Sequence, residues 1–549
     1  MKLRTLVVTT ILMAIASAAA FSQAKPSTNI PRLEKHGTAT QLIVDGKPYL
    51  ALAAELNNSS ASSLDYMRPL WPRITATNIN TVLATVCWEL IEPEEGKFDF
   101  SLADALIGDA RRHNLRLVVL WFGSWKNGKS TYQPLWVKTN QQRFPLVQDE
   151  KGKSLPILST LGDTNRDADA RAYAALMRHI REVDGEAHTV IMMQVENEVG
   201  ILGVSRDHSP AANQAFAGPV PREFMDYLQK HKDTLIPELR KRWEAAGFKT
   251  GGSWEEVFGP GIETDELFMA WNYARYIGRV AAAGKAEYPL PMYVNAWLRQ
   301  NADDKPGGYP SGGPLPHVMD AWRAGGPAID ILSPDIYVSN FTEWCDWYTQ
   351  SGNPLFIPES RGDARGVAHA IWAMGRHDAI AYSPFGIDRG AAADSELARG
   401  YEVLSQVAPL ILESQGSGKM TAVLVDREGQ PQKVRLGNYT LEARFSGERG
   451  FAPAAATPAA AALDRVAALF IAVGPDDYAI VSRSTDIHFA SATDDTQSVG
   501  LGTVEEGHYV NGRWVPGRRL NGDETPQWKA LRFPADRYSI QHVKLYRYR

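Results

Sequence analysis

The sequence has few cysteines, with only Cys87 and Cys345 among 549 residues. Two cysteines do not make a disulfide framework. Cys87 falls in a stretch that reads as a core strand, and cysteine is often buried as a free thiol. We therefore expect a buried free cysteine here. Apolar residues make up 44% of the chain and supply a large core without disulfides.

Strong charge of either sign is also absent. The net charge is −5 at pH 7, and no long basic or acidic run occurs. A nucleic-acid partner or an anionic membrane surface would favour such a run, so the sequence argues against both. Beyond the N-terminal segment, no stretch approaches the ~20 apolar residues of a spanning helix, so no membrane insertion is expected.

Motifs that hold metals or phosphates are missing as well. There is no His-Glu-x-x-His run, cysteine cluster, EF-hand loop or Walker-type loop. Each of these motifs binds its ligand through a fixed set of donors. We therefore expect no metal site and no cofactor.

The N-terminus has the pattern of a secretory signal. Lys2 and Arg4 form a basic start, residues 6–15 are mostly apolar, and small residues follow. Cleavage could fall after Ala20 or Ala24. Residues 1–24 are thus predicted to be a signal peptide, and the protein to be exported to the periplasm or the medium. Export would permit a disulfide, but a single possible pair does not require one.

At this length we expect more than one domain. Eight short apolar stretches alternate with helical patterns between residues 35 and 415. This alternation predicts a (β/α)₈ barrel, with insertions at 133–163 and 200–264, and residues 221–243 read as a helix. A doubly wound sheet would also alternate, but polar residues end many strands rather than meeting at one crevice. The expected strands are 49–56, 80–88, 115–122, 189–195, 292–297, 329–337, 354–359 and 379–385.

The sequence pattern changes near residue 419. Short β-like runs separated by Gly, Asn and Asp replace the helical patterns, which predicts a β-sandwich over 419–549. Residues 452–462, rich in Ala and Pro, read as a low-complexity loop. The fold class is therefore α/β, a (β/α)₈ barrel with an appended β-sandwich.

The chain's most informative motif is Gln194-Val195-Glu196-Asn197-Glu198-Val199-Gly200, which follows the apolar run 189–193. A second strand-end carboxylate, Glu359, ends the run Phe356-Ile357-Pro358-Glu359. Retaining glycoside hydrolases use two such carboxylates, a proton donor and a nucleophile. Glu196 alternates with Glu198 on an extended strand, so both could face one side, and one of them could be structural. Glu359 could instead begin a helix or pair with Arg361.

A third marker is Trp88-Glu89-Leu90-Ile91-Glu92-Pro93, which continues to Gly96-Lys97-Phe98-Asp99-Phe100. With these motifs the sequence resembles glycoside hydrolase family 35, the β-galactosidases. The resemblance also includes Ala53-Ala54-Glu55-Leu56-Asn57 and Leu332-Ser333-Pro334-Asp335-Ile336-Tyr337, and it covers roughly residues 35–415. Departures are Glu89 in place of Asn, Asn57 in place of His, and a third strand that ends in Trp121-Phe122-Gly123-Ser124-Trp125-Lys126-Asn127. The related family 42 has the same kind of barrel, with its catalytic residues at the strand ends.

The resemblance implies an exo-acting, retaining β-galactosidase that cleaves terminal galactosyl units from a galactosylated glycan. Glu198 would be the acid/base and Glu359 the nucleophile. The binding residues would be Asn197 at the sugar 2-hydroxyl, Glu55, Glu89, Asn295, Tyr337 as a hydrogen-bond donor to the nucleophile, and stacking tryptophans among Trp88, Trp121, Trp125 and Trp297. Two alternatives stay open: a same-clan enzyme for another sugar, such as a β-glucosaminide or α-arabinopyranoside, and a non-catalytic carbohydrate-binding barrel. The oligomeric state is not predicted.

Overall fold

The computed structural model describes residues 29–301, 303–446 and 463–549. The predicted signal peptide and the predicted loop at 452–462 lie outside these residues. Within the described part of the chain, no helix has the length and apolar character needed to cross a membrane.

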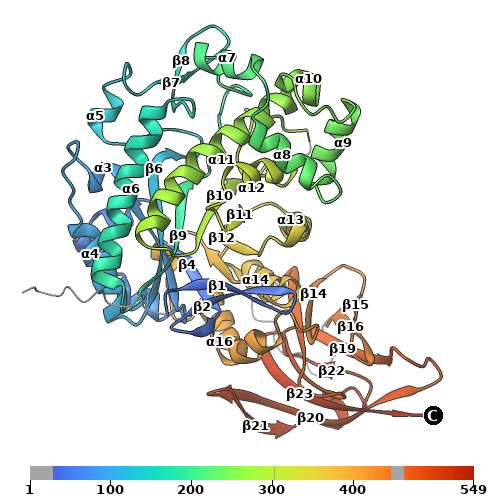
Figure 1. The fold of residues 1–549 in the computed structure, drawn as a ribbon. Coiled ribbons are helices and arrows are strands. Elements are labelled where there is room, and N and C mark those ends of the chain that lie inside the picture. The colour runs from blue at the N-terminus through green and yellow to red at the C-terminus, as the bar shows by residue number, and fades with distance from the viewer. Residues whose placement is uncertain (1–28, 302, 447–462) are drawn as a thin grey trace, which may run out of the picture.

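Eight parallel strands form the barrel (Figure 1), and their order around it follows the chain. The last strand pairs with the first, where Ala381 lies opposite Ala51. Between the sixth and seventh strands the Ile336 amide donates to the Glu359 carbonyl at 3.0 Å. All eight predicted strands are confirmed, with ends displaced by a few residues. They are β4 (Ala51–Glu55), β5 (Thr81–Cys87), β6 (Arg116–Lys126), β9 (Val190–Asn197), β10 (Met292–Trp297), β11 (Ile331–Asp335), β12 (Phe356–Ser360) and β13 (Ala381–Pro384).

Helices surround this barrel, because parallel strands must be covered on their outer face. Alternate residues of β6 show the two layers: Val118 and Leu120 belong to the inner cluster, whereas Val119 and Trp121 pack outward against helices. The covering helices are α1 (Leu64–Met67), α2 (Trp71–Thr75), α3 (Trp88–Ile91), α4 (Ser101–Arg112), α6 (Asp163–Asp184), α11 (Ile262–Glu287), α12 (Met319–Gly325), α13 (Phe341–Tyr348), α14 (Ala364–His377), α15 (Ile387–Gly390) and α16 (Glu396–Ser414).

A small antiparallel sheet precedes the barrel, formed by β1 (Arg32–His36), β2 (Ala39–Val44) and β3 (Lys47–Tyr49). Leu42 and Val44 of β2 join the inner barrel cluster. This sheet therefore closes the amino end of the barrel and leaves the carboxyl end for the long insertions.

Both predicted insertions are present after β6 and β9. The first contains α5 (Leu135–Lys138) and a hairpin of β7 (Leu146–Gln148) and β8 (Ser154–Leu158). The second contains α7 (Pro210–Ala217), α8 (Arg222–Lys230), α9 (Pro237–Ala245) and α10 (Trp254–Phe258). The single helix predicted over 221–243 is wrong: Ile236, with ψ 133°, precedes Pro237 and is forced out of the helical region, so the segment splits into α8 and α9.

The C-terminal part is a sandwich of two antiparallel sheets, as predicted. The four-stranded sheet shares a core with one face of the six-stranded sheet. The other face, including Ala422 and Leu469, packs on α14. Its strands are β14 (Met420–Asp426), β15 (Gln432–Leu436), β16 (Tyr439–Phe445), β17 (Arg465–Ala472), β18 (Asp477–Ser482), β19 (Thr485–Ser491), β20 (Ser498–Val510), β21 (Arg513–Arg519), β22 (Leu531–Arg532) and β23 (Ser539–Tyr548). The β-like runs expected from the sequence, 421–425, 433–436, 440–445, 469–472, 478–482, 529–533 and 543–546, correspond to the other seven strands. β19, β20 and β21 were not predicted.

The cysteine expectation is confirmed. Cys87 lies in β5 and Cys345 in α13, and both are buried and free.

Candidate active site

The backbone at the end of β9 sets the direction of its two glutamates. Glu196 has φ 64° and Glu198 has φ 42°, both in the left-handed region. Gly200 follows with φ 137°, and a Cβ there would meet the Pro310 carbonyl carbon at 2.5 Å. Because the chain is not extended here, the prediction that Glu196 and Glu198 face the same side of the strand is wrong. Glu196 and Glu198 lie in different surroundings.

Glu196 lies in a closed polar pocket between β6 and the helices. Its carboxyl oxygens accept from the Ser124 amide at 3.0 Å and the Trp125 amide at 2.7 Å. Asp169 of α6 lies beside it and accepts from the Ser124 hydroxyl at 2.7 Å. Burial raises the pKa of both Glu196 and Asp169. Glu196 therefore holds the end of β6 in place.

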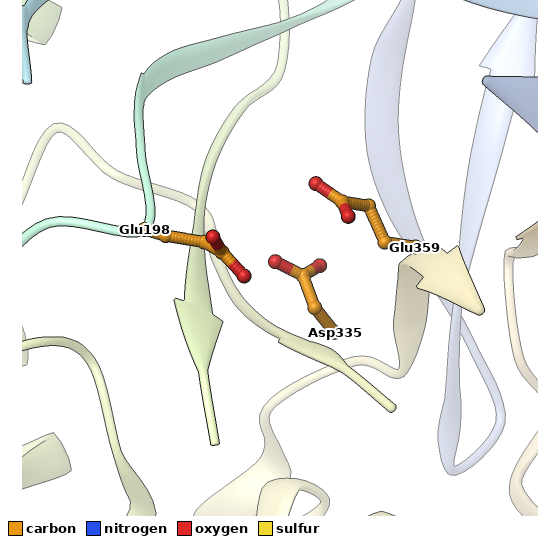
Figure 2. Close-up of side chains that lie close together, drawn as sticks. All are labelled: Glu198, Asp335 and Glu359. Carbon is orange, nitrogen blue, oxygen red and sulfur yellow. The ribbon is translucent and has the colours of Figure 1, made fainter. Parts of the chain in front are cut away.

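Glu198 faces the barrel axis, where it meets two other carboxyls (Figure 2). One oxygen each of Glu198, Asp335 and Glu359 lies within 4.8 Å of the other two. These residues come from the ends of β9, β11 and β12, and they are only 7%, 3% and 6% exposed. The structure thus brings the two predicted catalytic residues together at the carboxyl end of the barrel.

The three carboxyls cannot all be ionised without cost, because like charges this close repel. Burial and the Glu359 charge raise the pKa of Glu198 to about 7, and a hydrogen bond from Asp335 opposes the rise. Burial, Glu359 and Glu198 raise the pKa of Asp335. Glu55 of β4 faces the same group, and burial and Glu359 raise its pKa. The site is therefore poised to hold protons near neutral pH.

One buried cation, Lys126 at the end of β6, offsets this charge. It lowers the pKa of Glu198, Asp335 and Glu55. Its ammonium donates to Asn197 Oδ1 at 2.8 Å. Asn197 Nδ2 is left buried without a hydrogen-bond partner among the described residues. Lys126 thus fixes which way the Asn197 amide points.

Asn295 of β10 connects two of the carboxyl-bearing strands. Its Oδ1 accepts from the Glu198 amide at 2.9 Å, and its Nδ2 donates to Asp335 Oδ2 at 2.6 Å. Tyr337 donates from its hydroxyl to Glu359 Oε2 at 3.1 Å and is 45% exposed. The predicted contact between Tyr337 and Glu359 is therefore present, and Tyr337 lies at the opening of the site.

The predicted aromatic contacts are mostly not supported by the structure. Trp88, Trp121 and Trp125 are fully buried. Their indole N–H groups donate to Glu92 Oε2 at 2.8 Å, Asp169 Oδ1 at 2.9 Å and the Leu158 carbonyl at 3.1 Å, respectively. These rings are core residues of the helix layer. Trp297 differs: it is partly exposed and shares a face of β10 with Asn295.

Two other sequence-based interpretations need correction, for Glu89 and Arg361, and the structure also shows the contacts of Asn57. Glu89 pairs with Lys138 at 2.9 Å and does not belong to the carboxyl group. Arg361 pairs with Asp363 rather than with Glu359. Asn57 donates its amide and side-chain N–H groups to Asp388, each at 2.8 Å, which fixes the loop after β4.

Two residues of the site were missed, Asp335 and Lys126. Both belong to segments that carry the family resemblance or depart from it: Asp335 lies in the run 332–337, and Lys126 lies in the run 121–127. A strand-end carboxylate, the feature that selected Glu198 and Glu359, would also have selected Asp335. Lys126 had no such signal, because its strand continues four residues beyond the predicted end.

Among the described residues, this carboxyl group is also close enough to share a cation. Metal ligands must be deprotonated. Burial and the Glu359 charge raise the pKa of Glu198 to about 7, so a cation would have to compete with a proton for this carboxyl.

Two families match parts of the chain. Residues 71–277 match the model of glycoside hydrolase family 42, described as beta-galactosidase. This segment contains Glu198 and ends before Asp335 and Glu359. Residues 397–532 match a domain of unknown function, DUF5597, which covers α16 and most of the sandwich. The matched part of the barrel is similar to glycoside hydrolases of family 42. The matched family is 42, which the sequence analysis named as related to family 35. The resemblance to family 35 itself stays a prediction.

Known relatives share only part of their length with this chain. A beta-galactosidase from Xanthomonas manihotis is 26% identical over 218 residues, which is 37% of this chain and 32% of that protein. The beta-galactosidases of Bacillus circulans sp. alkalophilus and Rahnella sp. R3 have solved structures. They are 16% and 15% identical, with TM-scores of 0.46 and 0.45, and each comparison covers 66% of this chain and 57% of the other. This chain therefore spans about a third of the curated relative's length.

Proposed function

We propose that this protein is an exported, retaining exo-β-galactosidase with Glu198 as acid/base and Glu359 as nucleophile. The observation that carries the proposal is the approach of their oxygens to within 4.8 Å. Retaining enzymes place the two carboxyl groups about 5–5.5 Å apart, whereas inverting enzymes leave about 6.5–9.5 Å for a water. The low exposure of both residues suits a pocket that admits one terminal sugar.

In the first step Glu359 attacks the anomeric carbon of a terminal β-galactosyl unit. The bond to the leaving oxygen breaks, its electron pair stays on that oxygen, and Glu198 supplies the proton. The Tyr337 hydroxyl holds Glu359 Oε2 in position. The Asn197 Nδ2, which Lys126 orients, is the donor proposed for the sugar 2-hydroxyl.

In the second step Glu198 removes a proton from water, and the water oxygen attacks the same carbon. The bond between this carbon and Glu359 breaks with its electron pair left on the Glu359 carboxylate, and galactose leaves with retained configuration. The charges of the site favour this change of role. The Glu359 charge raises the pKa of Glu198 in the free enzyme. Once Glu359 is esterified that charge is gone, so the pKa of Glu198 falls and Glu198 becomes a base.

Asp335 takes part in this cycle as a proton-bearing neighbour. It is buried, it is tied to Asn295, and a hydrogen bond from it lowers the pKa of Glu198. We propose that Asp335 carries a proton and donates it to the Glu198 carboxylate, because two negative charges with oxygens within 4.8 Å of each other would repel. This role keeps the Glu198 carboxyl aimed at the leaving oxygen.

Export rests on the pattern of residues 1–24, and it suggests galactosylated plant polysaccharide fragments as the substrate. A panel of nitrophenyl glycosides tests the sugar, with a metal chelator in one arm of the assay. We expect β-galactoside to be cleaved fastest, and proton NMR to show β-galactose as the first product. Faster cleavage of a β-glucosaminide or α-arabinopyranoside would reassign the sugar, and no cleavage of any of them would favour a carbohydrate-binding barrel.

A further inference from the structure

A cavity opens at the carboxyl end of the barrel, and Glu198, Asp335 and Glu359 do not line it. It measures about 700 Å³ and lies between α9, the first turns of α11, the loop after β10 and the 3₁₀ turn Pro316–Val318. α9 and the strands β10 and β11 can be located in Figure 1. Ligand sites of proteins usually have volumes of ~300–1,000 Å³, so this cavity is large enough for one.

The cavity is close to the catalytic site along the chain. Asn295 accepts from the Glu198 amide, and Arg299, four residues later, lines the cavity. Four residues span at most ~14 Å, so the cavity wall begins within that distance of Asn295. Glu198 directly follows β9, and the cavity is lined by the insertion after β9 and the loop after β10. A glycan held at Glu198 could therefore extend toward it.

A buried polar network forms one wall. Glu266 of α11 is 1% exposed, and its Oε2 accepts from the Tyr309 hydroxyl at 3.1 Å and hydrogen-bonds His317 Nε2 at 2.8 Å. Its Oε1 has no hydrogen-bond partner within the described chain. Burying a carboxylate this deeply is costly unless partners hold it. The network fixes the wall and presents polar atoms among apolar neighbours.

The rest of the lining combines donors, acceptors and apolar surface. Leu239 and Val318 supply apolar area, and the half-buried Arg299 has no ion-pair partner within the part of the chain described. Arg242 is already paired with Glu263 at 3.3 Å. Charges of both signs argue against a simple ion site. Hydroxyl-rich ligands suit such a surface, since each hydroxyl both donates and accepts and the sugar ring has apolar faces.

We propose that this cavity is a second saccharide site, which binds neutral sugars of the glycan chain beyond the terminal unit. Arg299 donates to their hydroxyls, and Leu239 and Val318 contact a ring face. The proposal rests on the proposed function for its substrate class. The site would let the enzyme prefer galactosyl units on a chain over free galactosides.

The variant Arg299→Ala tests this, with Arg279→Ala, an exposed arginine of α11, as its matched control. KM is measured for nitrophenyl β-galactoside and for a galactosylated oligosaccharide with a backbone of four or more sugars. Loss of a charge-assisted hydrogen bond should raise the ratio of the oligosaccharide KM to the nitrophenyl galactoside KM about tenfold in Arg299→Ala. The ratio should stay constant in Arg279→Ala. An unchanged ratio in Arg299→Ala overturns the proposal.

Direct binding separates this proposal from the proposed function. Cellotetraose, mannotetraose and xylotetraose are each titrated into wild-type protein and into Val318→Trp, which fills the cavity. We expect heat from at least one tetrasaccharide with the wild type, and at least tenfold weaker binding in Val318→Trp. This result would support the cavity even if no galactoside were cleaved. No heat with any of the three, or equal binding in the variant, would exclude the saccharide site. Thermal unfolding of Val318→Trp checks that it is folded.

Discussion

Glu196 and Glu198 are two residues apart at one strand end and both are buried, yet their surroundings differ in kind. Glu196 is held by two backbone N–H groups and lies beside one other carboxyl. Glu198 has no such cradle and faces Asp335, Glu359 and the Lys126 charge. The first arrangement holds a carboxyl in place, and the second leaves its proton free to move. Burial of an acid therefore does not identify a catalytic residue; its partners do.

Exchange of the catalytic acids by their amides should have the largest effect. Glu359→Gln removes the nucleophile, and we expect turnover of nitrophenyl β-galactoside to become undetectable. Glu198→Gln removes the acid/base, which contributes about 10²–10⁴-fold. Its first step should be spared with a nitrophenolate leaving group, which needs no proton, so a burst of nitrophenol should precede slow turnover. Both variants should still bind galactose. Near-normal turnover in either one would refute the assignment.

Variants of Asp335 test whether this residue donates a proton to Glu198 or acts on it as a negative charge. Asp335→Asn keeps a donor toward Glu198, so we expect the alkaline limb of kcat/KM, near pH 7, to stay in place. Asp335→Ala removes that donor, so the pKa of Glu198 should rise and the limb should move to higher pH. The readout is the pH profile of each variant. If Asp335 is ionised instead, Asp335→Asn would lower the pKa of Glu198 and shift the limb to lower pH.

Lys126 should affect the same limb by its charge. The ammonium lowers the pKa of Glu198, so Lys126→Met should raise that pKa. Glu198 then stays protonated to higher pH, and the alkaline limb moves up. Lys138→Met is the matched control, because Lys138 pairs with Glu89 outside the carboxyl group. Equal shifts in both variants, or a downward shift in Lys126→Met, would contradict this role.

The barrel could be predicted because its strands are continuous apolar runs, the pattern of parallel strands buried on both faces. Glu198 and Glu359 could be predicted because each ends such a run. The direction of side chains at these ends could not. Glu196 and Glu198 have positive φ values, and the backbone at Gly200 lies close to Pro310, more than 100 residues away in sequence. Strand alternation therefore gave the wrong answer for this pair.

The tryptophans failed for a related reason. A tryptophan at a strand end fits the pattern of a sugar-stacking residue. Whether its ring points into the barrel or outward to the helices changes with a shift of one residue along the strand, because side chains alternate between the two faces. Trp121 lies on the outer face of β6 and bonds Asp169, whereas Trp297 lies on the Asn295 face of β10. The C-terminal sheets were predicted only in part, because β20 and β21 alternate weakly between buried and exposed residues.

The smallest effect is expected from Glu196→Gln, and it tests the comparison most directly. Burial raises the pKa of both Glu196 and Asp169, so the pair favours the loss of one negative charge. The Ser124 and Trp125 amides donate to different oxygens of Glu196, and glutamine keeps only one of these oxygens. Its N–H group can donate to Asp169, but one of the two backbone amides loses its acceptor. We expect kcat/KM within about twofold of wild type, because Glu196 lies outside the group of Glu198, Asp335 and Glu359, and a loss of stability of about 1–3 kcal/mol for the one amide left without an acceptor. Glu196→Ala should lower stability further, since it leaves both amides without an acceptor, at about 1–3 kcal/mol for each. A loss of turnover in Glu196→Gln as large as in Glu198→Gln would mean that the two glutamates act as one unit.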